Sequence, residues 1–282
     1  MPVAKPAGPT SHDVVAAVRR ALGGARTGHL GTLDPFADGV LVVVVGRATR
    51  LAQFAAAWPK TYEGVLRLGV TTDSDDRTGV TVATSDAWRA VTADALAVAV
   101  ARFRGTFAQR PPAFSAVRIA GERAYRRARR GEAVAPAART VTVFALEVTR
   151  FAPPDVGFRA AVSGGTYLRS LARDVGAALG CGAHLAALTR TAVGPFTLAD
   201  AVAPEAVTPA HLRPADALVG DLPRRELSDA EREAVVHGRA IAETGAGKGE
   251  GGRVALFHGS ELIAVADGVA GQLKPCVVVA DA

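Results

Sequence analysis

Apolar residues recur at helical spacing in four parts of the chain. Val14, Val18 and Leu22 share one face of a helix that Ser11 can cap. A second clear stripe follows Thr166, which is placed to cap another helix after a pair of glycines. The pattern predicts helices at residues 11–22, 48–57, 94–104 and 166–179.

Strands are predicted where β-branched and aromatic residues form short apolar runs. These runs cover residues 41–45, 62–70, 141–151, 157–163 and 185–196. Pro153 and Pro154 separate two of the runs at hairpin spacing, which indicates antiparallel pairing. Strands and helices also interleave without strict β-α-β alternation. We therefore expect an α/β (α+β) fold with a mixed, mainly antiparallel central sheet flanked by helices.

A proline-rich stretch predicts where a second domain begins. Its prolines are Pro204, Pro209, Pro214 and Pro223. We expect a large domain at 1–222 and a small β-rich domain at 223–282, with few core contacts between them. In the small domain Ser228 can cap a helix that ends at His237, and the glycine-rich residues 244–252 are expected to form a flexible loop. Short strands are predicted at 253–257, 262–266 and 276–279.

The composition is that of a globular protein without membrane or metal signals. Of the 282 residues, 49% are hydrophobic and 21% are charged. The apolar runs are too short to span a bilayer, and the N-terminus lacks a signal-peptide pattern. Cys181 and Cys276 lie far apart, which favours a reducing cytoplasm over a disulfide framework. Without Cys/His clusters at metal-ligand spacing or a phosphate-binding glycine loop, we expect neither a metal nor a cofactor.

Positive charge is concentrated in one segment. The whole chain carries a net charge of only +6, but residues 118–139 hold seven arginines against Glu122 and Glu132. The arginines are Arg118, Arg123, Arg126, Arg127, Arg129, Arg130 and Arg139. One interpretation is a solvated helix face. The other is a surface that binds phosphates through arginine and stacks a base on Tyr125.

The most informative segment is residues 28–40, which places one carboxylate among glycines. Pro35 disfavours helical dihedrals at Asp34, so this acid is expected in an extended loop. The glycines allow tight turns and a close approach by a ligand, and the apolar run 41–45 anchors the loop in the core. Two interpretations fit: a turn in which Asp34 bonds its own backbone, or a loop that holds one acid in a fixed place.

This segment resembles the signature G-H-x-G-T-L-D-P-x-A-x-G-V-L of the TruB-type tRNA pseudouridine synthases, with Leu30 and Phe36 at positions of variable type. The resemblance extends over five further blocks in the same order, at residues 5–11, 60–63, 109–117, 163–171 and 180–185. It implies that Asp34 is the essential catalytic residue and that the fold is that of a pseudouridine synthase.

The resemblance also implies two partners for this aspartate. Arg169 matches a guanidinium that keeps a buried carboxylate charged, which desolvation alone would oppose. Tyr62 matches an aromatic residue that stacks on the target base and accepts or relays a proton. The pattern alone also fits Arg169 as a surface salt-bridge residue and Tyr62 as a core tyrosine.

In the family, the substrate is the T-stem-loop of tRNA, modified at position 55 after the base leaves its stack. His29 matches the residue that occupies the vacated space, and residues 112–139 match a mobile insertion that closes over the RNA. Residues 223–282 resemble a PUA-type RNA-binding module. The other residues that the resemblance places at the RNA are Lys5, Arg110, Tyr167, Leu188, Arg126, Arg127, Arg129 and Arg130.

Two other classes of function remain open. One is an RNA-binding or tRNA-folding protein without catalysis, although Asp34, Tyr62 and Arg169 together favour an enzyme. The other is a guide-RNA-dependent subunit of a ribonucleoprotein, which needs protein partners and carries longer basic extensions. We expect a cytoplasmic, monomeric, stand-alone enzyme that acts on tRNA, with no membrane and no obligate protein partner.

Overall fold

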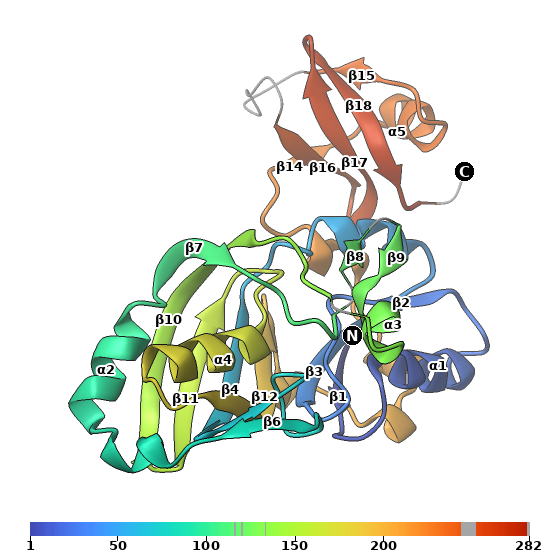
Figure 1. The fold of residues 1–282 in the computed structure, drawn as a ribbon. Helices are drawn as coiled ribbons and strands as arrows, with labels where there is room; N and C mark the ends of the chain where they lie inside the picture. Colours follow the sequence, from blue (N-terminus) through green and yellow to red (C-terminus); the bar gives the residue numbers. More distant parts are fainter. Residues whose placement is uncertain (116, 120, 133, 244–251, 281–282) are drawn as a thin grey trace.

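The computed structural model describes residues 1–115, 117–119, 121–132, 134–243 and 252–280 (Figure 1). Within them, nine strands form one sheet in the order β1-β3-β12-β4-β11-β10-β7, with β2 beside β3 and β13 beside β12. Only the pair β3–β12 is parallel among these strands, so the predicted mixed and mainly antiparallel sheet is confirmed. The strands are β1 Pro2–Lys5, β2 Thr27–His29, β3 Asp38–Val45, β4 Lys60–Leu68, β7 Gly105–Gln109, β10 Arg139–Ala152, β11 Asp155–Val162, β12 Ala183–Val193 and β13 Phe196–Thr197.

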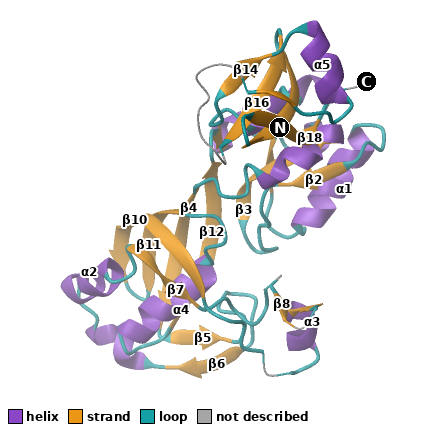
Figure 2. Ribbon diagram, turned by 90° about the horizontal axis from the view of Figure 1, so that it is seen from above, coloured by secondary structure: helices purple, strands orange, loops and turns teal. Residues whose placement is uncertain are grey.

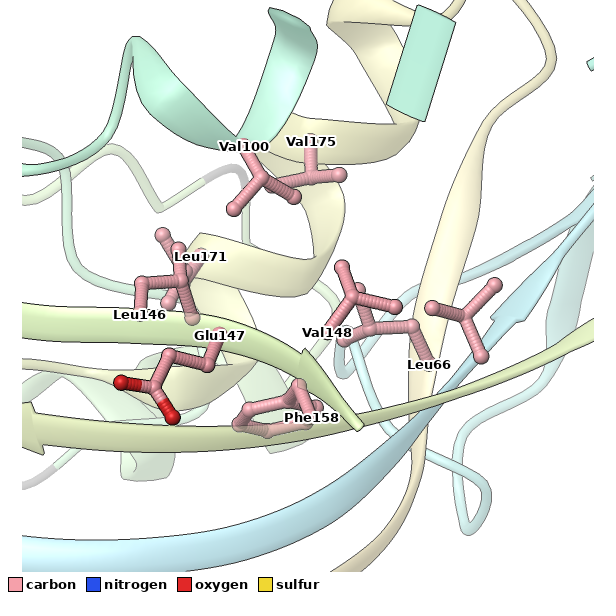
Figure 3. A pocket seen from close by; sticks show the side chains of 9 residues that line it. Leu66, Val100, Leu146, Glu147, Val148, Phe158, Leu171 and Val175 are labelled. Carbon is pink, nitrogen blue, oxygen red and sulfur yellow. The ribbon is translucent and has the colours of Figure 1, made fainter. Parts of the chain in front are cut away.

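Helices pack on this sheet through their apolar stripes. Figure 1 shows α4 (Leu168–Ala178) lying across the strands, with α2 (Ala93–Ala101) beside it and α1 (Ser11–Ala21) next to β1 and β3. The core under α4 is closely packed: the cavity in Figure 3 measures about 10 Å³ and is lined mainly by apolar side chains such as Leu66 and Leu171. A cavity of this size holds at most about one water molecule, so α4 packs closely against the sheet.

Three predicted local details differ in the structure. The cap of α1 is Thr10, which forms a reciprocal capping box with Asp13, and not Ser11. The N-cap of α4 is Tyr167, not Thr166, and it makes no side-chain cap bond. The predicted helix at 48–57 is the 3₁₀ helix Gly46–Gln53, which is tighter and shorter.

Short elements connect the larger ones. Two small hairpins are formed by β5 Val70–Thr72 with β6 Thr81–Thr84 and by β8 Arg118–Ile119 with β9 Glu122–Arg123. The second hairpin leads into α3, Ala124–Arg129, and Figure 2 shows this arginine-rich unit standing apart from the sheets. The remaining 3₁₀ helices are Asp86–Ala90, Leu198–Asp200, Pro204–Ala206, Pro209–His211 and Ala215–Leu218.

The C-terminal part is a second, smaller sheet. Its order is β14-β16-β17-β18-β15, with α5 packed against it (Figure 1). As predicted, Ser228 caps α5, through a capping box with Glu231. The elements are β14 Arg224–Glu226, α5 Asp229–Val236, β15 Ile241–Ala242, β16 Arg253–His258, β17 Glu261–Val269 and β18 Gln272–Val278. Residues 244–251 of the predicted loop lie outside the described residues.

The two parts share a hydrophobic core, which contradicts the predicted scarcity of core contacts. One buried cluster joins Leu51 and Trp58 of the large part with Phe257 and Val265 of the small one. The indole Nε1 of Trp58 also donates to Asp221 Oδ2 over 3.1 Å. Prolines at 204–223 shape the connection, but apolar faces on both sides of it still bury one another. None of the helices in the described ranges is long and apolar enough to cross a membrane.

Candidate active site

The loop between β2 and β3 carries Asp34. Gly31 has a φ of +87°, a left-handed conformation that suits glycine, and Pro35 follows the aspartate directly. The amide of Ala37 donates to the carbonyl of Asp34 over 3.1 Å and closes a turn. The Ser11 hydroxyl donates to the Leu33 carbonyl over 2.9 Å and accepts from the Leu33 amide over 2.8 Å. The loop is therefore held by bonds on both sides of the acid.

Asp34 and Arg169 form a bidentate ion pair, although 135 positions separate them in the chain. Arg169 Nε donates to Oδ2 over 2.9 Å and Nη2 donates to Oδ1 over 3.1 Å. The Asp34 side chain is 33% exposed, whereas that of Arg169 is 5% exposed. The carboxylate thus lies at an opening with a buried guanidinium behind it, so Arg169 is no surface salt-bridge residue.

Further acceptors fix the Arg169 guanidinium. Nη2 also donates to the carbonyl of Phe114 over 2.9 Å, and Nη1 donates to the carbonyl of Ser74 over 3.0 Å. Nη1 lies 3.5 Å from Oδ2 of Asp76, an acid whose side chain is 5% exposed. Sequence analysis missed Asp76, because nothing in its acidic turn distinguishes this acid from its neighbours. Arg169 therefore holds one carboxylate at the opening and another in the interior.

The charges around Asp34 oppose one another. Burial raises the pKa of Asp34 above its ordinary value, and the nearby charge of Asp76 adds to this rise. The guanidinium of Arg169 and the ammonium of Lys5 favour the ionised form and limit the rise. The expected competition between desolvation and a guanidinium is present, and desolvation prevails.

Tyr62 lies on β4 and is 6% exposed. It belongs to the same apolar cluster as Leu33 and Phe36, which flank Asp34 in sequence. Within the described residues its hydroxyl has no hydrogen-bond partner, unlike a core tyrosine with a bonded hydroxyl. Leu188 is a further member of this cluster and is 7% exposed in the protein alone, so its contact with RNA stays a prediction.

Lys5 is buried in the protein alone, so its predicted contact with RNA stays a prediction. Its side chain is 1% exposed, and Nζ donates to the carbonyls of Ala37 over 2.6 Å and Pro6 over 2.9 Å. A longer contact of 3.4 Å reaches the carbonyl of Pro35. In this structure Lys5 therefore braces the Asp34 loop from β1.

His29 and Tyr167, two residues predicted to contact RNA, have different surroundings in the protein. Burial and the charge of Arg190 lower the pKa of His29, so the ring is neutral, and its Nδ1 is buried without a partner in the described residues. Tyr167 is anchored by Gln109, which accepts from its amide over 2.9 Å and donates to its carbonyl over 3.1 Å. The Arg139 guanidinium lies 5.5 Å from the Tyr167 ring centre, a cation–π contact. Arg110 is exposed.

The arginine-rich unit is partly neutralised by its own acids. Arg130 donates to both oxygens of Glu122 over 2.6 and 2.8 Å, and Glu132 accepts from Arg127 over 2.6 Å. These ion pairs reduce the repulsion between neighbouring arginines. Arg126 is exposed, and the side chain of Arg129 lies outside the described part of the structure. No three acid, histidine or cysteine side chains gather as a metal site in the described ranges.

Two family models together match residues 19–232. Residues 19–168 match the TruB family pseudouridylate synthase N-terminal domain, and residues 169–232 match the tRNA pseudouridylate synthase B C-terminal domain. The tRNA pseudouridine synthase B of Thermobifida fusca (strain YX) is 46% identical, covering 99% of this chain and 97% of that protein. The tRNA pseudouridine synthase B of Azoarcus sp. (strain BH72) is 42% identical, covering 96% and 91%.

Solved structures with the same fold include chains in complexes that contain Cbf5. The chain matches one in the archaeal box H/ACA sRNP Nop10–Cbf5 complex with a TM-score of 0.74 and 27% identity, covering 99% of this chain and 85% of that one. It matches another in a Cbf5–Nop10–Gar1 complex with a TM-score of 0.73 and 30% identity, covering 99% and 83%. This chain therefore belongs to the TruB family of pseudouridylate synthases.

Proposed function

We propose that this protein isomerises uridine to pseudouridine at position 55 in the T-stem-loop of tRNA. The observation that carries the proposal is the bidentate pair of Asp34 and Arg169 at an opening of the protein surface. Family membership supports the reaction, and relatives named tRNA pseudouridine synthase B support tRNA as the substrate.

The reaction needs one carboxylate and no redox change. The bond from ribose C1′ to uracil N1 breaks, the base rotates, and C1′ joins C5 while the C5 proton leaves and N1 is protonated. Asp34 acts as nucleophile or as the charge that stabilises the cleaved intermediate. Arg169 orients both carboxylate oxygens and favours the ionised form. Tyr62 stacks on the base in the apolar part of the site and accepts or relays the proton.

The target base must leave its stack to reach Asp34, which costs a few kcal/mol. His29 then fills the space in the RNA, and its neutral ring suits a stacked environment better than a charged one. The arginine-rich unit and Arg110 contact phosphates around the loop. Residues 223–282 act as a PUA-like RNA-binding module beside the catalytic part, residues 1–222.

The protein works as a stand-alone cytoplasmic monomer. Its identity of 46% to a tRNA pseudouridine synthase B over nearly the full length of both chains exceeds the 27–30% to Cbf5 in complexes with partner proteins. This difference favours an enzyme that binds tRNA directly over a guide-dependent subunit.

The test uses the purified protein and an unmodified T-stem-loop transcript, with a transcript carrying cytidine at position 55 as the matched control. Mapping is expected to find pseudouridine at position 55 only, with no protein or guide RNA added. The Asp34→Asn variant is expected to bind the RNA within a few-fold of the wild type and to lose several orders of magnitude in rate. Wild-type-like yield from this variant would refute the catalytic assignment. RNA binding without any product would support the non-catalytic alternative.

A further inference from the structure

Arg190 is the largest fully buried side chain in the described part of the chain, and the chemistry above does not use it. Its guanidinium donates to three backbone carbonyls: Nε to Val40 over 2.7 Å, Nη2 to Gly31 over 3.0 Å and Nη1 to Thr32 over 3.4 Å. No carboxylate pairs with it among the described residues. A buried cation bound only to carbonyls is costly to desolvate, so its contacts need a specific reason.

Those three carbonyls lie on both sides of Asp34 in the chain. Gly31 and Thr32 come before the aspartate, and Val40 comes after it. One planar guanidinium on β12 therefore binds the chain before the aspartate, within the loop, and after it, at Val40 of β3. The geometry needs several nitrogens in one plane, and a lysine has only one.

The backbone of Arg190 lies between the two strands that matter for the site. In the sheet register it pairs with Gly39 on β3 and with Tyr62 on β4. The strands approach so closely that a Cβ at Gly39 would lie 2.2 Å from the Arg190 carbonyl oxygen, and Gly39 has a φ of +108°. Arg190 therefore links the strand that leaves the Asp34 loop to the strand that carries Tyr62.

We propose that Arg190 is a positioning residue of the active site. It fixes the chain on both sides of Asp34 so that the carboxylate meets the Arg169 fork and keeps its place relative to Tyr62. The inference rests on the proposed function, because it assigns Arg190 to the same site.

The first test compares Arg190→Lys with Arg104→Lys. Arg104 also donates twice to one carbonyl, that of Leu146 over 2.7 and 3.0 Å, but on β10 and away from the Asp34 loop. Single-turnover rates are measured at saturating RNA, and affinities are measured in the Asp34→Asn background. A displacement of about 1 Å costs about 100-fold in rate, so Arg190→Lys is expected to lose about 100-fold with affinity within threefold. Arg104→Lys is expected to keep its rate.

A second pair of variants perturbs the Gly31 end of this contact and leaves Arg190 itself in place. Gly31 and Gly24 share a φ of +87°, so alanine strains both backbones alike. At Gly31 the added Cβ would lie 3.2 Å from Lys60 Cε, a tight contact, and 3.7 Å from Arg190 Nη1, an ordinary van der Waals distance, whereas nothing lies within 4 Å at Gly24. Gly31→Ala is expected to lose about tenfold in rate and Gly24→Ala to keep it. If Arg190→Lys fails to fold, this pair decides.

Hydrogen exchange separates a failure of this inference from a failure of the proposed function. The bonded amides of Leu33 and Ala37 are expected to exchange faster in Arg190→Lys and at the wild-type rate in Arg104→Lys. This readout needs no activity, so it stands even if the wild type makes no pseudouridine at position 55. Unchanged exchange, or a rate for Arg190→Lys equal to that of Arg104→Lys, would overturn the positioning assignment.

Discussion

Replacing Arg169 by lysine keeps the positive charge at the site and removes the fork. Arg169 makes four hydrogen bonds through three nitrogens: two to Asp34 and one each to the carbonyls of Phe114 and Ser74. A lysine has one nitrogen, which can hold only one carboxylate oxygen and cannot span the other acceptors. The Asp34 side chain then regains rotation at an opening where it is 33% exposed.

The lost hydrogen bonds lower the stability of the protein, and the misplaced carboxylate slows the reaction. Lysine loses the two hydrogen bonds to the carbonyls of Phe114 and Ser74. Each such bond contributes about 0.5–1.5 kcal/mol in net stability, so the free energy of unfolding is expected to fall by about 1–3 kcal/mol. Misplacing the carboxylate by about 1 Å is expected to slow the reaction about 100-fold, which corresponds to about 2.7 kcal/mol in the barrier. RNA affinity is expected to stay within a few-fold, because the bonds that Arg169 makes here all lie inside the protein.

The assay is pseudouridine formation under single turnover, with unfolding in urea measured on the same samples. The matched control is Arg173→Lys, one turn along α4. Arg173 donates to Asp75 over 2.9 Å and to the carbonyl of Arg110 over 3.0 Å, and its side chain is 31% exposed. We expect the control to keep its rate within threefold. A wild-type rate for Arg169→Lys, or equal losses in both variants, would refute the orientation argument.

Three further outcomes follow from the structure. Burial raises the pKa of Asp34, so the single-turnover rate is expected to reach a plateau above that pKa and to fall as the pH decreases through it. A rate that stays constant down to pH 4 would contradict a raised pKa. Replacing the arginines of the arginine-rich unit by neutral residues is expected to reduce the slope of log affinity against log salt concentration by about 0.7–0.9 for each phosphate that the protein no longer binds. An unchanged slope would favour the interpretation of the unit as a solvated helix face. The variant for this test replaces Arg126, Arg127, Arg129 and Arg130 together. Deleting residues 223–282 uncovers Leu51 and Trp58, so the truncated protein is expected to aggregate; a soluble, cooperatively folding fragment in size-exclusion and thermal-unfolding measurements would show that the shared core is dispensable.

The sequence by itself predicted the elements that local patterns specify. The period of apolar residues reports which face of a segment is buried, and this identified α1, α4 and the antiparallel hairpin of β10 and β11. The resemblance to the family implied that Asp34 and Arg169 share one site, and the structure joins them by two hydrogen bonds. Helix caps were less predictable, because Thr10 and Ser11 are adjacent and both suited to capping.

Only the tertiary structure decided which polar residues support the site from within. By residue type Lys5 and Arg190 suggest surface cations, but both are buried and bind carbonyls of the Asp34 loop. The place of Asp76 at the site is evident only from the structure, in which its carboxylate lies 3.5 Å from Arg169 Nη1. The same holds for the apolar cluster shared by the two parts of the chain. These contacts depend on which segments far apart in the chain meet, and a local pattern of hydrophobic and polar residues reports only which face of each segment is buried.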